Sequence, residues 1–131
     1  MKKTITFTLL LGLNSLTHAY IPSGYNDALN HIRDQEAKLK QCALLMKEDT
    51  PCYAEANKNY DSLIRVIRAK HSDRIDVKLW QRINLGFKKQ MENCKSDAVR
   101  PLRRTLYYPY GECKSSSYHS FAVTTVELHL R

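Results

Sequence analysis

Apolar residues recur at helical spacing through most of the chain. From about Asn26 to Lys47 they come at steps of three, four and seven residues, which places them on one face of an amphipathic helix. The same spacing continues from about Pro51 to Lys70, and from Ser72 or Asp73 to about Cys94. The pattern therefore predicts three successive helices. Their expected inward residues are Leu29, Ile32, Leu39, Ala43 and Met46 in the first, Ala56, Tyr60, Leu63, Ile64 and Ile67 in the second, and Leu79, Trp80, Ile83, Phe87 and Met91 in the third.

Capping residues fit these boundaries. Asn26 or Asp27 can cap the first helix, and Thr50 can cap the second, with Pro51 at the first helical position, where a missing N–H costs nothing. Ser72 or Asp73 can cap the third helix. Because the turns are short, the second and third helices are expected to lie antiparallel.

The rest of the chain has a different character. Residues 95–117 include Pro101, Pro109 and Gly111, and they are expected to form a loop. In residues 118–131, the run from Val123 to Val126 favours a strand, whereas Ser120 can cap a helix. A helix is expected, since a single strand would have no partner. The predicted fold class is all-α: a small three- to four-helix bundle, or an antiparallel helical hairpin with an extra helix, stapled by two disulfides.

The N-terminal segment has the organisation of a cleavable signal peptide. Lys2 and Lys3 precede an apolar run from Ile5 to Leu16, which is too short to span a bilayer, and small residues precede a cut after Ala19. The expected organisation is a signal peptide over residues 1–19 and a single domain over residues 20–131. The predicted location is periplasmic or secreted, with no membrane span in the mature chain.

Four cysteines lie in the mature domain, and an even set in a short exported domain indicates two disulfides. They are Cys42, Cys52, Cys94 and Cys113. Helix geometry places the first three at one end of the bundle and leaves two pairings open: Cys52–Cys94 with Cys42–Cys113, or Cys42–Cys94 with Cys52–Cys113. No C-x-x-C pair and no finger-like spacing is present, so no metal and no cofactor are expected.

The chain is basic, with a formal net charge of +8. Without Lys2 and Lys3 the mature domain has 19 basic and 13 acidic residues, which leaves a net charge of +6. Such a charge favours anionic partners, among which nucleic acid is unlikely outside the cytoplasm. An alternative function follows from this charge: an envelope-associated structural protein that binds anionic polymers.

Arginine and tyrosine, which carry much of the energy in binding interfaces, gather in the predicted loop. The candidate binding surface consists of Arg100, Arg103, Arg104, Tyr107, Tyr108 and Tyr110. A different interpretation is that this loop is a packing strap held by Cys113. The surface predicts a protein partner, such as a hydrolase or a toxin, whose identity the sequence does not give.

Catalysis is not expected. The mature chain has four histidines, His31, His71, His119 and His129, but no H-E-x-x-H, G-x-S-x-G or phosphate-binding glycine loop. With the cysteines oxidised, a thiol nucleophile is also not expected.

The cysteine spacing resembles that of the LprI-type lysozyme-inhibitor-like family of small exported helical domains. Cys52 is followed nine residues later by Asp61, and Phe87 stands seven residues before Cys94, with Asn84 in the place of a usual glutamine. Cys113 and a terminal helix would complete the pattern.

Three positions depart from the family pattern: Arg68 replaces a tyrosine, Met91 replaces an arginine, and Trp80 lies two turns from the usual tryptophan. The resemblance implies a helical disulfide fold and a lysozyme- or hydrolase-inhibitor-like role; an immunity-type protein would have similar properties. The positive charge of the mature domain opposes long-range attraction to a cationic lysozyme.

Overall fold

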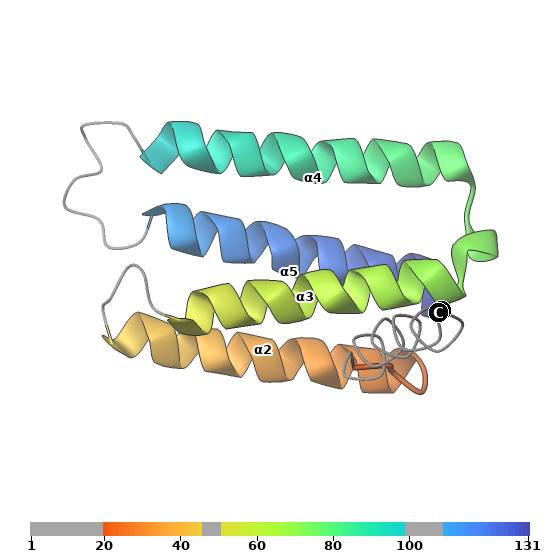
Figure 1. Cartoon of the computed structure of the whole chain (residues 1–131), viewed down its shortest axis with the longest axis horizontal. Coiled ribbons are helices and arrows are strands. Elements are labelled where there is room, and N and C mark those ends of the chain that lie inside the picture. Colours follow the sequence, from red (N-terminus) through yellow and green to blue (C-terminus); the bar gives the residue numbers. More distant parts are fainter. Residues whose placement is uncertain (1–19, 46–50, 99–108) are drawn as a thin grey trace, which may run out of the picture.

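The computed structural model describes residues 20–45, 51–98 and 109–131, with side chains for all of these except 42–45, 51, 52, 96–98, 109 and 110. Within these ranges the chain forms four α-helices and a short 3-10 turn, and no strand (Figure 1). The elements are α2 (Tyr25–Leu45), α3 (Pro51–Lys70), η1 (Ser72–Arg74), α4 (Val77–Ala98) and α5 (Pro109–Leu130). The all-α class predicted from the sequence is confirmed. The predicted signal peptide lies outside the described residues.

Helix α3 supplies more of the buried core cluster than any other helix, and its predicted inward face is confirmed. Ala56, Tyr60, Leu63, Ile64 and Ile67 are all buried. The helix begins at Pro51 and ends at Lys70, as the capping signals indicate. Its buried face contacts both α2 and α5.

Helix α2 starts with a cap that differs from the predicted one. Neither Asn26 nor Asp27 is the capping residue; instead the Asp27 carboxylate accepts hydrogen bonds from the backbone N–H and the hydroxyl of Ser23, at 2.8 and 3.2 Å. The first helical hydrogen bond runs from the N–H of Ala28 to the carbonyl of Gly24, at 3.0 Å. Asp27 thus fixes the entry turn from inside the first turn of the helix, where a carboxylate also suits the helix dipole.

Helix α4 begins later than the sequence pattern predicts. Ser72 lies in the 3-10 turn, and the cap is Asp76, whose side chain accepts a hydrogen bond from the N–H of Lys78 at 3.3 Å. The expected inward residues Trp80, Ile83, Phe87 and Met91 are only half-buried, and Leu79 is exposed. Helix α4 packs chiefly on α5 and lies on the outside of the bundle (Figure 1).

The predicted loop over residues 95–117 is wrong at both ends. Helix α4 continues to Ala98, and α5 begins at Pro109, so the helix over residues 118–131 extends nine residues further toward the N-terminus. Pro109 is the first residue of α5, where proline needs no hydrogen-bond donor, and Glu112 in the first turn suits the helix dipole. Thr125 fits into this helix because its hydroxyl donates to the carbonyl of Phe121, at 2.7 Å.

The core lies where α2, α3 and α5 meet. Ala28 and Ile32 from α2 and Phe121, Ala122 and Val126 from α5 pack with the buried face of α3. Helix α4 adds only half-buried side chains to this cluster, among them Trp80, Ile83 and Phe87. The fold is therefore a three-helix core with a fourth helix laid along α5.

Cys94 and Cys113 form a disulfide with a Cα–Cα distance of 5.5 Å, which contradicts both predicted pairings. Cys113 does not follow the helices in a returning loop but lies near the start of α5. Helix α5 runs antiparallel to α4, so its start meets the end of α4, where Cys94 lies (Figure 1). Cys42 lies in α2 and Cys52 in α3, and their side chains fall outside the described part of the structure.

None of the helices in the described ranges combines the length and the apolar character needed to cross a membrane.

Candidate functional site

Most of the candidate surface predicted from the sequence falls outside the described residues. Arg100, Arg103, Arg104, Tyr107 and Tyr108 belong to residues 99–108, which the structure does not describe. Tyr110 lies in the first turn of α5, and its side chain is not described. The prediction that this surface binds a partner stays a prediction.

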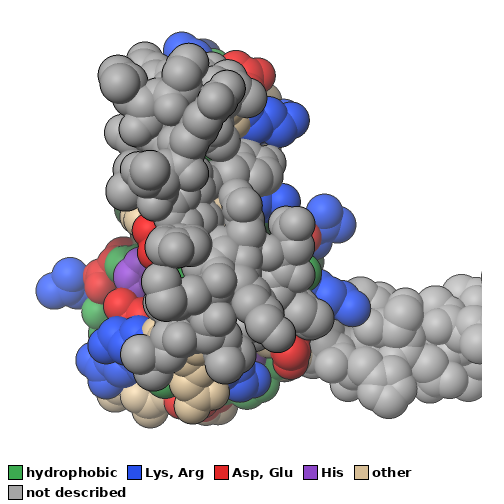
Figure 2. Space-filling model, turned by 90° about the vertical axis from the view of Figure 1, so that its left-hand side faces the viewer, with side chains coloured by type: hydrophobic (Ala, Val, Ile, Leu, Met, Phe, Trp, Pro, Cys, Tyr) green, Lys and Arg blue, Asp and Glu red, His purple; other side chains and the backbone are tan. Residues whose placement is uncertain are grey.

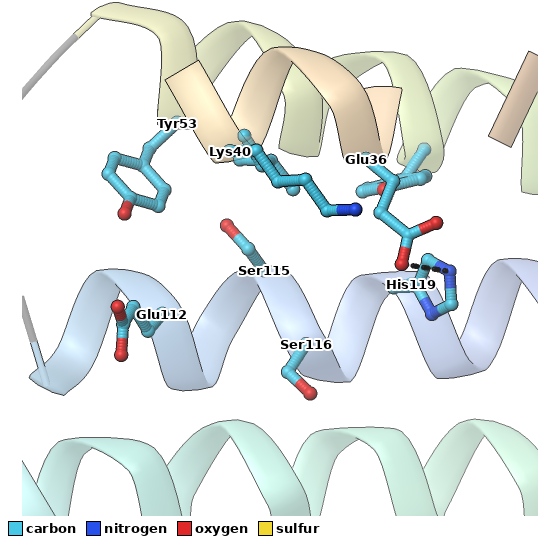
Figure 3. A pocket seen from close by; sticks show the side chains of 9 residues that line it. Glu36, Lys40, Tyr53, Glu112, Ser115, Ser116 and His119 are labelled. Carbon is cyan, nitrogen blue, oxygen red and sulfur yellow. Dashed lines mark ion pairs between the residues drawn. The ribbon is translucent and has the colours of Figure 1, made fainter. Parts of the chain in front are cut away.

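A cavity of about 320 Å³ opens between α2, α3 and α5. It lies toward the end of the bundle where α2 ends and where α3 and α5 begin (Figures 1 and 3). The nine residues that line it are Glu36, Leu39, Lys40, Tyr53, Tyr60, Glu112, Ser115, Ser116 and His119. Eight of these nine residues carry a polar or titratable side chain, Leu39 being the exception.

Helical spacing explains how three helices supply this cavity. Tyr53 and Tyr60 are seven residues apart and so share one face of α3. Glu112, Ser115 and His119 follow one another at steps of three and four along α5. In Figure 3, Ser115 and His119 of α5 point toward the side chains of α2 and α3, Glu112 lies against α5 itself, and Ser116 points away from the cavity.

The rim of the cavity is charged and open to solvent. His119 and Glu36 stand 4.0 Å apart, with side chains that are 34% and 51% exposed, and they form an ion pair when the imidazole is protonated. Lys40 and Glu112 are also exposed. At this exposure such a pair contributes little to stability, on the order of 0–1 kcal/mol, so the rim charges remain available to a ligand.

Tyr60 forms part of the wall, and its hydroxyl is the most unusual group in the site. The residue is completely buried, and its hydroxyl has no hydrogen-bond partner within the described residues. Burial, together with the negative charge of Glu36, raises the pKa of Tyr60 to about 12, so the hydroxyl stays neutral at physiological pH. The rings of Tyr60 and His119 meet edge to face, with their centroids 6.0 Å apart.

Two side-chain hydrogen bonds join the three helices that form this cavity. The hydroxyl of Ser115 on α5 donates to Oδ1 of Asn57 on α3 at 3.0 Å, and both residues are buried. Nearby on the chain, Nδ2 of Asn59 on α3 donates to Oε1 of Gln35 on α2 at 2.9 Å. These bonds satisfy the polar groups next to the cavity, which makes the unpartnered Tyr60 hydroxyl an exception.

A second polar centre lies at the other end of α5. His129 is buried, and its Nδ1–H donates to the carbonyl of Thr125 at 2.7 Å. Its Nε2 then accepts from a guanidinium N–H of Arg68, at 3.4 Å, and Arg68 also lies over the ring of Trp80, at 5.0 Å. Burial and the nearby Arg68 charge lower the pKa of His129. This centre joins α3, α4 and α5 but does not line the cavity between α2, α3 and α5.

Sequence reasoning missed the cavity although it named several of its residues. Tyr60 and Leu39 were expected on inward faces, whereas the charged residues of the rim, Glu36 and Lys40, lie between the apolar positions of the first helix and drew no prediction of a site. The three-to-four spacing of Glu112, Ser115 and His119 is a helical signal, but it lay across a segment expected to be a loop. Within the described residues, no group of three or more histidine, cysteine or acidic side chains is placed to hold a metal ion.

No protein-family model, no curated protein and no solved structure matches this chain. The resemblance to the LprI-type family accordingly depends on the cysteine spacing and the few positions around it.

Proposed function

We propose that this chain is an exported protein-binding module, of the hydrolase-inhibitor-like or immunity type, that captures a protein partner. The observation that supports it best is the open cavity between α2, α3 and α5. Tyrosine rings line its wall, and exposed charges stand at its rim. This combination of aromatic anchors and a polar rim is typical of binding interfaces.

The cavity and the predicted loop give two surfaces to compare. The experiment measures capture of a partner from periplasmic extract by the oxidised mature domain, and by two variants of it. One variant replaces Arg103, Arg104, Tyr107 and Tyr108 by alanine, and the other carries Glu36→Gln and Glu112→Gln in the cavity. We expect the same saturable partner to be retained by the wild type and lost or weakened in at least one variant, with both thermal melts unchanged.

A lysozyme inhibitor would also reduce the lysis of cell walls by a purified lysozyme. We expect inhibition with a stoichiometric endpoint, because an inhibitor acts by occupying the enzyme. If neither variant changes capture, and if no saturable partner is found, the proposal is wrong. If the loop variant loses its cooperative melt instead, residues 99–108 have a structural role.

The alternative, binding to anionic envelope polymers, would require positive charge to gather on one surface. On the face in Figure 2, the described lysine and arginine side chains lie among aspartate and glutamate side chains. On this face the described charges therefore form no continuous positive surface of the kind that a polyanion would need. Binding to polymers that disappears between low and physiological salt would support the alternative.

A further inference from the structure

The cavity between α2, α3 and α5 is rich in hydrogen-bond acceptors. Glu36 and Glu112 contribute carboxylates, which only accept when ionised. Ser115 uses its hydrogen on Asn57, so the lone pairs of its oxygen remain as acceptors. The ligand that such a surface recognises has several donors and a positive charge.

The Tyr60 hydroxyl adds a site that the protein itself leaves unused. A buried polar group without a partner destabilises the folded state, because it has lost its hydrogen bonds to water and gained none. The hydroxyl of Tyr60 has no partner in the described structure, and its ring lines the cavity. A donor group that enters the cavity and reaches this oxygen would remove that cost.

One of the chain's own cations already lies in the cavity, although it does not bond to the Tyr60 hydroxyl. In Figure 3 the Lys40 side chain lies across the cavity, with its ammonium directed toward Glu36. Lys40 is exposed, so it can move aside at little energetic cost. The other titratable side chains that line the cavity are Glu36, Glu112, Tyr60, Tyr53 and His119.

We propose that this cavity binds an arginine side chain of the protein partner, and that Lys40 is displaced when it binds. Arginine fits better than lysine because its planar guanidinium carries five donors, which suit a site lined by two carboxylates and several hydroxyl oxygens. The inference rests on the proposed function and deepens it, since it identifies the group that the partner presents. It also gives a basic domain a local site for a basic group.

The direct test titrates the oxidised mature domain with N-acetyl-arginine amide and follows the amide signals of α2, α3 and α5 by NMR. N-acetyl-citrulline amide has nearly the same shape without the charge and serves as the matched ligand control. We expect saturable shifts around the cavity for the arginine compound, with affinity that decreases as salt is raised. Equal binding of the citrulline compound, or no saturable binding of either, would overturn the proposal.

Four variants assign the contacts. Glu36→Gln and Glu112→Gln are each expected to lower the affinity for the arginine compound about two- to fivefold. Tyr60→Phe is expected to lower this affinity about two- to tenfold, because one hydrogen bond to the ligand is lost. Lys40→Met should strengthen binding by about two- to fivefold, since the internal competitor is removed. Glu92→Gln, an exposed change on α4 away from the cavity, is the control and should leave binding unchanged.

The outcome separates this inference from the proposed function. If a partner protein binds the wild type and the cavity variants equally, the arginine site is wrong and the binding function stands. If the arginine compound binds as expected but a captured partner does not compete with it, the cavity is a cation site that the partner does not use, and the inference about the partner's arginine is wrong. If the compound binds and no saturable protein partner is found at all, the proposed function is wrong. Circular dichroism spectra and melts establish that each variant remains folded.

Discussion

The two halves of the α2–α3–α5 core are built from different kinds of side chain. In the half near the start of α2, Ile32, Leu63, Ile67 and Val126 are buried against one another. The buried polar residues there, Thr125 and His129, bond to carbonyls of their own helix and border no cavity. In the half near the start of α5, the buried positions include Gln35, Asn57 and Ser115, and a cavity lies beside them. One half obtains its stability from close apolar packing, whereas the other gives up packing for hydrogen bonds and an open site. The difference indicates where the molecule can hold a ligand without losing its fold.

The largest expected effect lies in the apolar half. Ile67→Ala should destabilise the domain by about 2–5 kcal/mol, because Ile67 is 1% exposed and its removal leaves a closed void. The matched change in the cavity half is Leu39→Ala, at a half-buried residue that already borders open space, with an expected cost of about 1 kcal/mol. Urea denaturation measures both. Equal losses would contradict the contrast between the halves.

The disulfide is expected to have the next largest effect. Replacing Cys94 and Cys113 together by alanine should lower the free energy of unfolding by about 3 kcal/mol, since the bridge closes a loop with a sequence separation of 19. The measurement is the urea midpoint of the double variant under oxidising conditions. A change below about 1 kcal/mol would mean that noncovalent contacts of α4 with α5 already hold this end together.

A smaller loss of stability is expected when a hydrogen bond of the cavity half is removed. Ser115→Ala should cost about 1–2 kcal/mol, because it leaves Oδ1 of the buried Asn57 without its donor. Ser116→Ala is the matched control on the exposed neighbour and should change the stability by less than about 0.5 kcal/mol. A Ser115→Ala variant as stable as the control would show that water replaces the hydroxyl.

His129 should make stability depend on pH. Because its folded-state pKa is lowered from 6.5, the unfolded chain binds the proton more readily. The stability that the neutral His129 imidazole gives the fold is therefore fully present above about pH 6.5, and it is lost as the pH falls toward the folded-state pKa. Comparing the slope of unfolding free energy against pH for wild type and His129→Gln isolates this residue, since His31, whose pKa is also lowered, is present in both. Identical slopes would contradict the prediction.

The smallest expected change is at Tyr60. Tyr60→Phe should leave the free protein as stable as wild type or more stable, by up to about 1 kcal/mol, because a buried hydroxyl without a partner is removed. A thermal melt by differential scanning calorimetry measures it. A clear loss of stability would mean that the hydroxyl has a partner, such as ordered water.

Helix periodicity predicted the parts of the fold where one face is continuously apolar. Every expected inward residue of α3 is buried, and both of its ends were correct. Pro51 was recognised as a first helical residue because Thr50 and an apolar run surround it. Pro109 has the same role in α5, but Gly111 and the serines after it have little apolar periodicity, so it was interpreted as a breaker.

The error at Pro109 also led to the wrong disulfide pairing. With Cys113 assigned to a returning loop, its partner was sought among Cys42 and Cys52; with α5 antiparallel to α4, Cys94 is the neighbour. The cavity could not be predicted for a different reason. Whether a tyrosine hydroxyl such as that of Tyr60 finds a partner depends on which atoms of two other helices face it, and periodicity contains no such information.

The bridge between Cys94 and Cys113 makes the chain between them a covalent ring. The five arginines and tyrosines from Arg100 to Tyr108 that were predicted to bind a partner belong to that ring by their position in the sequence. A protease that cuts once within it therefore releases no fragment: the cleaved chain keeps its mass, apart from one added water, until the disulfide is reduced. Such a nick would be visible on a reducing gel and silent on a nonreducing one.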